Sequence, residues 1–162
     1  MRDPLQKLIP FSEAAFHARQ LHSDSARIVS TNGCFDLLHL GHLNTLREAR
    51  GLGSCLWIGL NSDASVRRLK GLGRPLNDEK TRALQLAALE AVDFITVFDD
   101  ATPQKWLELV RPAVHVKGGD YRPADLPERA VVEAGGGTVA CLPFTDGYST
   151  TSLIERIRTF SL

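Results

Sequence analysis

The chain alternates short runs of apolar and β-branched residues with longer segments of helical periodicity, and this alternation restricts the fold more than any other feature. The strand-like runs are 26–32, 54–61, 93–100, 113–119 and 138–144. The run SCLWIGLN (54–61) is almost continuously apolar, as expected of a strand that helices cover on both faces. Strands that alternate with helices form parallel units with right-handed crossovers. The sequence therefore predicts a doubly wound α/β sheet of five parallel strands.

Segments with helical spacing fill the intervals between these runs and flank them at both ends. They are 41–53, 62–71, 77–92, 102–112, 127–137 and 149–160. Residues 1–25 also show helical apolar spacing, at Phe11, Ala14, Ala15, Ala18 and Leu21. We predict an N-terminal helical extension over 1–25, whose extra helix packs on the outside, and a single domain over 26–162.

Composition excludes several classes of protein. The 162 residues carry a formal net charge of zero, so there is no basic field to hold nucleic acid. No apolar run approaches the roughly 20 residues of a membrane span, and the N-terminus lacks the apolar segment of a signal peptide. Cys34, Cys55 and Cys141 fit no zinc spacing and suit a reducing compartment. We expect a cytoplasmic protein without nucleic-acid or membrane partners.

Polar residues gather directly after four of the five predicted strands. NGCFDLLHLGH (32–42) follows the first strand, NSD (61–63) the second, KGGDY (117–121) the fourth and TDGYSTT (145–151) the fifth. In a doubly wound, Rossmann-like sheet, ligands bind beyond the carboxyl ends of the strands, where the strand order reverses. These clusters therefore predict one ligand site at that edge of the sheet.

The stretch 32–42 indicates the kind of ligand. The chain lacks a G-x-x-x-x-G-K-[ST] loop and has no G-x-G-x-x-G after the first strand. Instead, His39 and His42 stand three residues apart around Gly41, where a helix is predicted to begin. A helix N-terminus favours phosphate, and glycine permits a close approach. We interpret the pair as a phosphate site; a surface pair, or a transition-metal pair completed by Cys34 and Asp36, is the alternative.

Two of these segments resemble a known superfamily. CFDLLHLGH (34–42) resembles the H-x-G-H motif of the cytidylyltransferase-like nucleotidyltransferases, and STTSL (149–153) resembles their second motif. The resemblance extends from about Ser30 to Ile157. The segments GLNSDASVRRLKG, RPLND and VKGGDY are very similar to adenylyltransferases that act on D-glycero-β-D-manno-heptose 1-phosphate. In many bacteria that activity is one half of a fused sugar kinase and adenylyltransferase, and we expect this chain to be the stand-alone form.

The resemblance implies a reaction and its participants. AMP would pass from ATP to the sugar 1-phosphate, giving pyrophosphate and ADP-heptose for the lipopolysaccharide core. Magnesium would bridge the phosphates, and we assign no metal ligand among the protein's residues. His39, His42 and Lys70 are the expected catalytic residues. Relatives often associate, so a homodimer or larger homo-oligomer is expected.

Two further groups of residues are expected at the site. The nucleotide group contains Asn32, Gly33, Cys34, Phe35, Gly41, Lys117, Gly118, Asp120, Ser149, Thr150 and Thr151. The group for the sugar phosphate contains Asp36, Asn61, Asp63 and Arg82. Some members also suit purely structural roles. Asp36 and Asp120 fit turns, Asp63 fits a helix cap, and Arg82 fits a surface pair with Asp78.

Competing functions stay open at this point. Motif spacing does not fix the base, so a cytidylyltransferase for glycerol 3-phosphate or a similar alcohol phosphate is the nearest alternative. Glycerol-phosphate cytidylyltransferases carry an arginine just upstream of the second motif, where this chain has Phe144, Thr145 and Asp146. A non-catalytic nucleotide-binding module would bind nucleotide without releasing pyrophosphate, and a metal-binding regulatory domain would use the histidines for zinc.

Overall fold

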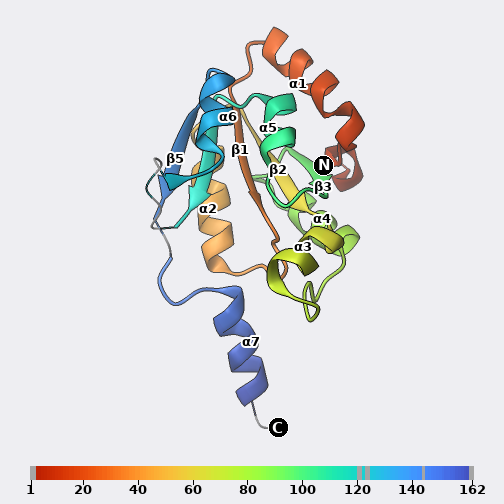
Figure 1. Cartoon of the computed structure of the whole chain (residues 1–162), viewed down its shortest axis with the longest axis vertical. Helices are drawn as coiled ribbons and strands as arrows, with labels where there is room; N and C mark the ends of the chain where they lie inside the picture. The colour runs from red at the N-terminus through yellow and green to blue at the C-terminus, as the bar shows by residue number, and fades with distance from the viewer. Residues whose placement is uncertain (1–2, 120–121, 123–124, 144, 161–162) are drawn as a thin grey trace.

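A computed structural model shows a five-stranded parallel sheet with helices on both faces (Figure 1). It describes residues 3–119, 122, 125–143 and 145–160. The strands are β1 (Ile28–Gly33), β2 (Cys55–Asn61), β3 (Phe94–Phe98), β4 (Val114–Gly118) and β5 (Thr138–Leu142). Their order in the sheet is β3-β2-β1-β4-β5, so the order reverses between β1 and β4. The predicted doubly wound sheet of five parallel strands is confirmed.

In the described part of the chain, six α-helices come after β1. They are α2 (Leu40–Arg50), α3 (Asp63–Lys70), α4 (Glu79–Ala87), α5 (Gln104–Val110), α6 (Arg129–Ala134) and α7 (Thr150–Thr159). Each begins within a few residues of its predicted segment, and most end earlier because a capping residue or turn stops them. The helices α2 and α4 cover one face of the sheet, with Leu46 and Leu86 in the core. The helices α5 and α6 cover the other face, with Trp106 and Val132.

The N-terminal residues attach to the open edge of the sheet. Two short 3-10 turns, η1 (Pro4–Lys7) and η2 (Phe11–Glu13), precede α1 (Ala14–Ser23), which packs against α5. Between the turns, Ile9 N donates to Ile95 O at 2.8 Å, and Ile9 O accepts from Thr96 Oγ1 at 3.0 Å. The same hydroxyl accepts from Trp57 Nε1 at 3.0 Å. The segment before α1 therefore covers the edge strand β3 as well as supplying the extra helix.

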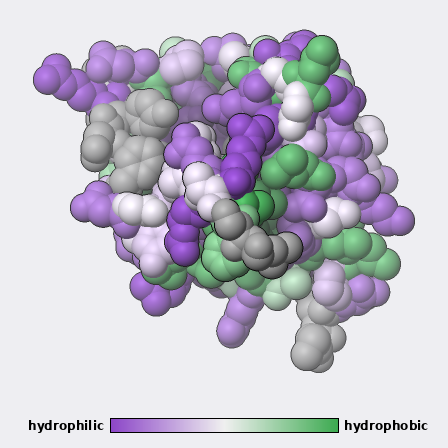
Figure 2. Space-filling model, turned by 90° about the horizontal axis from the view of Figure 1, so that it is seen from below, coloured by the Kyte–Doolittle hydropathy of each residue, from purple (hydrophilic) through white to green (hydrophobic). Residues whose placement is uncertain are grey.

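The arrangement brings several helix N-termini to one end of the sheet. In Figure 1 the carboxyl end of β1 and the first turns of α2, α3 and α7 lie toward the lower end of the molecule. The helix α7 projects from this end, and none of its residues is buried. Viewed from this end, the surface is mostly hydrophilic with separate apolar patches (Figure 2). The predicted ligand edge is thus an accessible end of the molecule.

Gly59 in β2 lies where the sheet packs tightly against α5, and a substitution at this position tests that packing. A Cβ atom at this position would lie 2.7 Å from Cε3 and Cζ3 of Trp106, whose side chain is fully buried. We expect Gly59→Ala to lower the free energy of unfolding by about 1–3 kcal/mol, because the indole ring has no room to retreat. Urea denaturation measures this. The control is Gly73→Ala, where a Cβ would meet nothing within 4 Å; equal stability losses in the two variants would contradict the account.

Candidate functional site

The two motif histidines lie together at the start of α2. His39 is the N-cap residue, and its Nδ1 accepts from the backbone N of His42 at 3.4 Å. The two rings are stacked, with centroids 3.8 Å apart. A Cβ on Gly41 would lie 3.1 Å from Cε1 and Nδ1 of His39. Any residue other than glycine would therefore push the His39 ring out of this position. The sequence spacing therefore produces a paired imidazole site on a helix N-terminus.

Burial keeps both histidines neutral near pH 7. Burial, joined by the neighbouring His39, lowers the pKa of His42 to about 4. Burial likewise lowers the pKa of His39. The Nδ1 atom of His42 is buried without a hydrogen-bond partner among the described residues. Because an adjacent anion raises a histidine pKa, a bound phosphate would favour proton uptake by this pair.

The start of α7 lies beside the start of α2. Tyr148 O is 3.6 Å from the place that a Cβ on Gly41 would occupy, and Asn44 Nδ2 donates to Thr145 Oγ1 at 3.1 Å. Ser149 caps α7 and forms a capping box with Ser152. Thr150 and Thr151 follow in the first turn. The structure therefore brings the two sequence motifs together, with two helix N-termini at one place.

The carboxyl ends of β1 and β4 form the next part of the site. Lys117 Nζ donates to Asn32 Oδ1 at 2.8 Å and forms an ion pair with Glu128 Oε1 at 2.6 Å. A Cβ on Gly118 would lie 3.1 Å from Thr45 Oγ1, so the glycine lets β4 approach α2 closely. The predicted residue Asp120 lies outside the described residues.

The loop between β1 and α2 is held by its own aspartate. Asp36 is buried, and its carboxylate accepts from Leu76 N at 2.8 Å, Asn77 N at 2.9 Å and Arg74 Nε at 2.5 Å. Burial alone would raise the pKa of Asp36, but the Asn77 and Leu76 amides and then Arg74 hold it below its usual value. This side chain therefore fixes the 74–77 segment against the histidine loop.

Arg82 of α4 is fully buried, and each nitrogen of its guanidinium group donates a hydrogen bond to a protein oxygen. Its Nη1 donates to Cys34 O at 2.6 Å and to Asn61 O at 2.8 Å. Its Nε donates to Asn77 O at 3.0 Å, and its Nη2 pairs with Asp63 Oδ1 at 2.8 Å. The guanidinium therefore joins the ends of β1 and β2 to the start of α3. The alternative that the sequence left open, a surface pair with Asp78, does not form through this side chain.

The remaining predicted residues differ in exposure. Lys70 ends α3 and is exposed, and no hydrogen bond or ion pair within the described structure engages its ammonium. Its charge acts on Cys34, whose thiol pKa is nevertheless raised because burial outweighs Lys70, Arg82 and Arg74. Phe35 takes the left-handed φ of 46° and lays its ring 5.1 Å from that of His42. Cys34 and Phe35 thus line the approach to the histidines.

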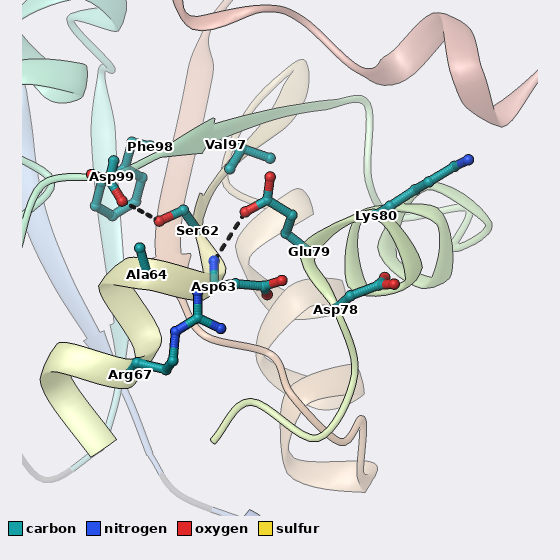
Figure 3. A pocket seen from close by; sticks show the side chains of 10 residues that line it. All are labelled: Ser62, Asp63, Ala64, Arg67, Asp78, Glu79, Lys80, Val97, Phe98 and Asp99. Atoms are coloured by element: carbon teal, nitrogen blue, oxygen red, sulfur yellow. Dashed lines mark hydrogen bonds between the residues drawn. The ribbon is translucent and has the colours of Figure 1, made fainter. Parts of the chain in front are cut away.

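A hollow of about 650 Å³ lies beside this site, at the carboxyl ends of β2 and β3 (Figure 3). It lies between the first turns of α3 and α4, with Glu79 Oε2 accepting from Asp63 N at 2.9 Å. The histidines do not line it, but Asp63 links it to Arg82. Its lining residues are Ser62, Asp63, Ala64, Arg67, Asp78, Glu79, Lys80, Val97, Phe98 and Asp99.

Sequence reasoning missed several residues of this site. Glu128, Arg74 and Asn77 hold predicted site residues in place, and Asn44 holds Thr145 upstream of the second motif. RPLND drew attention to the 74–77 segment, but nothing in the sequence pairs Glu128 with Lys117. Only the fold brings the start of α6 to the end of β4.

The described side chains do not form a metal-binding cluster by themselves. Within the described ranges, no group of three or more histidine, cysteine, aspartate or glutamate side chains could hold a metal ion. Magnesium takes oxygen ligands and in phosphate-transfer sites relies largely on substrate phosphates. Among the described residues, the side chains alone therefore provide no complete metal site.

The fold and site together define an α/β domain of the nucleotidyltransferase class. Three features together distinguish it from dehydrogenases and P-loop kinases. The strand order of its parallel sheet reverses between β1 and β4, it has no dinucleotide fingerprint, and it carries a histidine pair on a helix N-terminus. Residues 30–156 match the sequence model of the cytidylyltransferase-like family. The chain belongs to that family.

Individual relatives agree with this assignment. Bifunctional protein HldE of Geotalea uraniireducens (strain Rf4) is 56% identical over 136 residues, which is 84% of this chain and 28% of the relative. Its counterpart in Bradyrhizobium sp. (strain ORS 278) is 49% identical over 146 residues, 90% of this chain and 30% of the relative. The chain spans less than a third of the length of these relatives.

Solved structures share the fold. The lipopolysaccharide core biosynthesis protein from Thermoplasma volcanium GSS1 is 27% identical, with a TM-score of 0.62 over 76% of this chain and 99% of that chain. The pantoate-beta-alanine ligase from Francisella tularensis is only 10% identical, with a TM-score of 0.62 over 92% of this chain and 72% of that chain.

Among the described residues, no helix has the length and apolar character to cross a membrane.

The half-buried His42 and the fully buried His115 predict a loss of stability on mild acidification. The pKa of His42 is about 4, and burial, with Lys117 nearby, lowers the pKa of His115 to about 3. In the unfolded chain both rings take up protons below about pH 6.5, whereas the folded protein takes them up only near pH 4 and below. The unfolded state therefore binds more protons in this window, and stability falls as pH falls.

Urea denaturation at pH 7 and pH 5 measures this effect. The unfolding midpoint should be lower at pH 5, and His42→Asn should show a smaller difference between the two pH values. The lowered pKa of Asp36 acts only below its unfolded value of 3.8, outside this comparison. Equal midpoints at the two pH values would show that the rings accept protons without unfolding.

Proposed function

We propose that the chain transfers AMP from ATP to D-glycero-β-D-manno-heptose 1-phosphate, producing ADP-heptose and pyrophosphate. The observation that carries this proposal is the stacked His39–His42 pair on the N-terminus of α2, with the start of α7 beside it. Two helix N-termini and two imidazoles suit a triphosphate in which negative charge develops during transfer. The similarity to HldE proteins supports the choice of base and sugar.

The reaction requires no covalent intermediate on the protein. An oxygen of the sugar phosphate forms a bond to the α-phosphorus of ATP while the bond from that phosphorus to the bridging oxygen breaks. Pyrophosphate leaves with the bonding electron pair. His39 and His42 would donate hydrogen bonds to the α-phosphate and the leaving group. Because the rings are fixed by stacking and capping, they would act mainly by positioning and electrostatic stabilisation.

The proposed nucleotide contacts surround this pair. Asn32, Gly33, Cys34 and Phe35 lead from β1 to the histidines, and Gly41 permits close approach of a phosphate. Lys117 and Gly118 end β4 next to β1. Ser149, Thr150 and Thr151 would meet the outer phosphates at the start of α7. Lys70, whose ammonium is exposed, would reach the triphosphate or the attacking phosphate. Asp120 stays a prediction from the sequence.

The sugar phosphate is proposed to lie toward the β2 side of the site. Asp63 lines the hollow of Figure 3. Carboxylates there can accept hydrogen bonds from a polyol, and hydroxyl groups can both donate to it and accept from it. Asn61 precedes it and is fixed by donating to Ser65 Oγ at 2.9 Å. Asp36 and Arg82, whose polar groups bond protein atoms, would contribute by holding the walls of the site.

The conditions and assembly of the reaction are also proposals. Magnesium would arrive with the triphosphate and neutralise part of its charge. The need for ATP and the free cysteines Cys34, Cys55 and Cys141 suit the cytoplasm. A homo-oligomer stays a prediction. The exposed apolar residues Ile157 in α7 and Phe160 directly after it are compatible with it.

Pyrophosphate release tests the proposed reaction directly. The purified chain is given ATP or CTP with either D-glycero-β-D-manno-heptose 1-phosphate or glycerol 3-phosphate, in the presence of magnesium. We expect release only with ATP and the heptose phosphate. Release with CTP and glycerol 3-phosphate would preserve the roles of the histidines but overturn the substrates. No release with any pair from folded protein would contradict catalysis and favour a nucleotide-binding module.

A further inference from the structure

A largely buried charged pair, Lys117 and Glu128, stands behind the carboxyl end of β1, and the proposed reaction gives its glutamate no role. The side chains of Lys117 and Glu128 are only 17% and 6% exposed, and their charged atoms lie 2.6 Å apart. Lys117 Nζ also lies 2.8 Å from Asn32 Oδ1. The three side chains come from β4, from the turn before α6 and from β1. They form a continuous chain of contacts that ends at the predicted nucleotide site.

The chemistry of lysine fixes which way the asparagine amide faces. An ammonium group only donates hydrogen bonds, so the amide atom facing it is the oxygen. The Nδ2 group of Asn32 is therefore the end left for another partner, and no acceptor for it occurs among the described residues. Asn32 is half-buried two residues before Cys34, at the start of the loop that leads to His39. An oriented donor is thus presented at the edge where ligands bind.

The Glu128 carboxylate has a single partner among the described residues. Its Oε2 is buried and has no hydrogen-bond partner among the described residues, while Oε1 meets Lys117. A buried carboxylate is costly unless it is paired, so Glu128 and Lys117 hold one another firmly. Without the carboxylate, the flexible lysine side chain could turn away, toward solvent or a phosphate. Asn32 would then lose the contact that orients its amide.

We propose that Glu128 is a positioning residue for nucleotide binding: it holds Lys117, which fixes the Asn32 amide as a donor to an acceptor atom of the nucleotide. This inference rests on the proposed function because it takes the ligand to be ATP. It assigns Lys117 the role of orienting a neighbour, in addition to any contact of its own. The charge of Lys117 is already matched by Glu128, which distinguishes it from the unpaired ammonium of Lys70.

The test measures the dissociation constant of ATP by calorimetry in a double-mutant cycle. Asn32→Ala should weaken ATP binding about tenfold, the effect of losing one hydrogen bond to a charged group. Glu128→Gln, which keeps the shape of the side chain, should weaken binding by a similar factor. In the Asn32→Ala background, Glu128→Gln should produce no further loss, because it acts through Asn32. A merely structural role would add its effect in both backgrounds.

A glutamate one turn further along provides the matched control. Glu133 in α6 pairs with Arg129 at 2.6 Å on the exposed surface, so Glu133→Gln removes a similar charge without touching Asn32. It should leave ATP affinity unchanged. Unfolding midpoints check that each variant is folded, and Lys117→Met, a second break in the same chain of contacts, should also weaken ATP binding. Equal ATP affinity in wild type and Glu128→Gln, or additive losses in the cycle, would overturn the inference.

Binding and turnover separate this inference from the proposed function. If the cycle is non-additive but the wild-type chain forms no ADP-heptose, the positioning role stands and the proposed reaction fails. If ADP-heptose forms but the losses add, the reaction stands and the positioning role fails. Absence of ATP binding to the folded wild-type chain would contradict both.

Discussion

The buried guanidinium of Arg82 is the interaction on which the carboxyl edge of the sheet depends. It donates to Cys34 O, Asn61 O and Asn77 O and pairs with Asp63. Those acceptors belong to the end of β1, the end of β2, the 74–77 segment and the start of α3. Removing one partner of a buried charge typically costs about 3–5 kcal/mol. The loops around the site therefore have defined positions because one side chain satisfies four of their polar groups.

Asp36 completes this arrangement from the other direction. Its buried carboxylate accepts from two backbone amides and from Arg74, which holds the 74–77 segment to the loop after β1. Arg82 of α4 donates to Asn77 O in the same segment. The histidine loop between β1 and α2 is thereby supported before any ligand arrives. On its other side, Asn44 and the Tyr148 backbone connect α2 to the start of α7. Such support matches the need of phosphate transfer for donors that are already in place.

The sequence was sufficient for the elements and for the motif, because both depend on local patterns. Strand runs and helical periodicity predicted the sheet, and the H-x-G-H spacing predicted the histidine pair, although the sequence offered Asp63 as a helix cap and the N-cap of α3 is Ser62. It was insufficient for burial and pairing. Arg82 looked like a possible surface partner of Asp78, yet its side chain is buried against Asp63. Lys117 meets Glu128 only because β4 and α6 fold together. Long-range contacts of this kind leave no periodic signal in one sequence.

The central claim is that the stacked histidines stabilise transfer of the α-phosphate. The most direct measurement follows label from ATP radiolabelled at the α-phosphate into the sugar product, for wild type, His42→Asn and the control His17→Asn. His17 lies in α1 and faces Glu13, away from the site. The account predicts that the α-label enters the sugar nucleotide, that the rate falls by about 10² or more in His42→Asn, and that His17→Asn behaves as wild type. Undiminished label transfer by folded His42→Asn would contradict the claim.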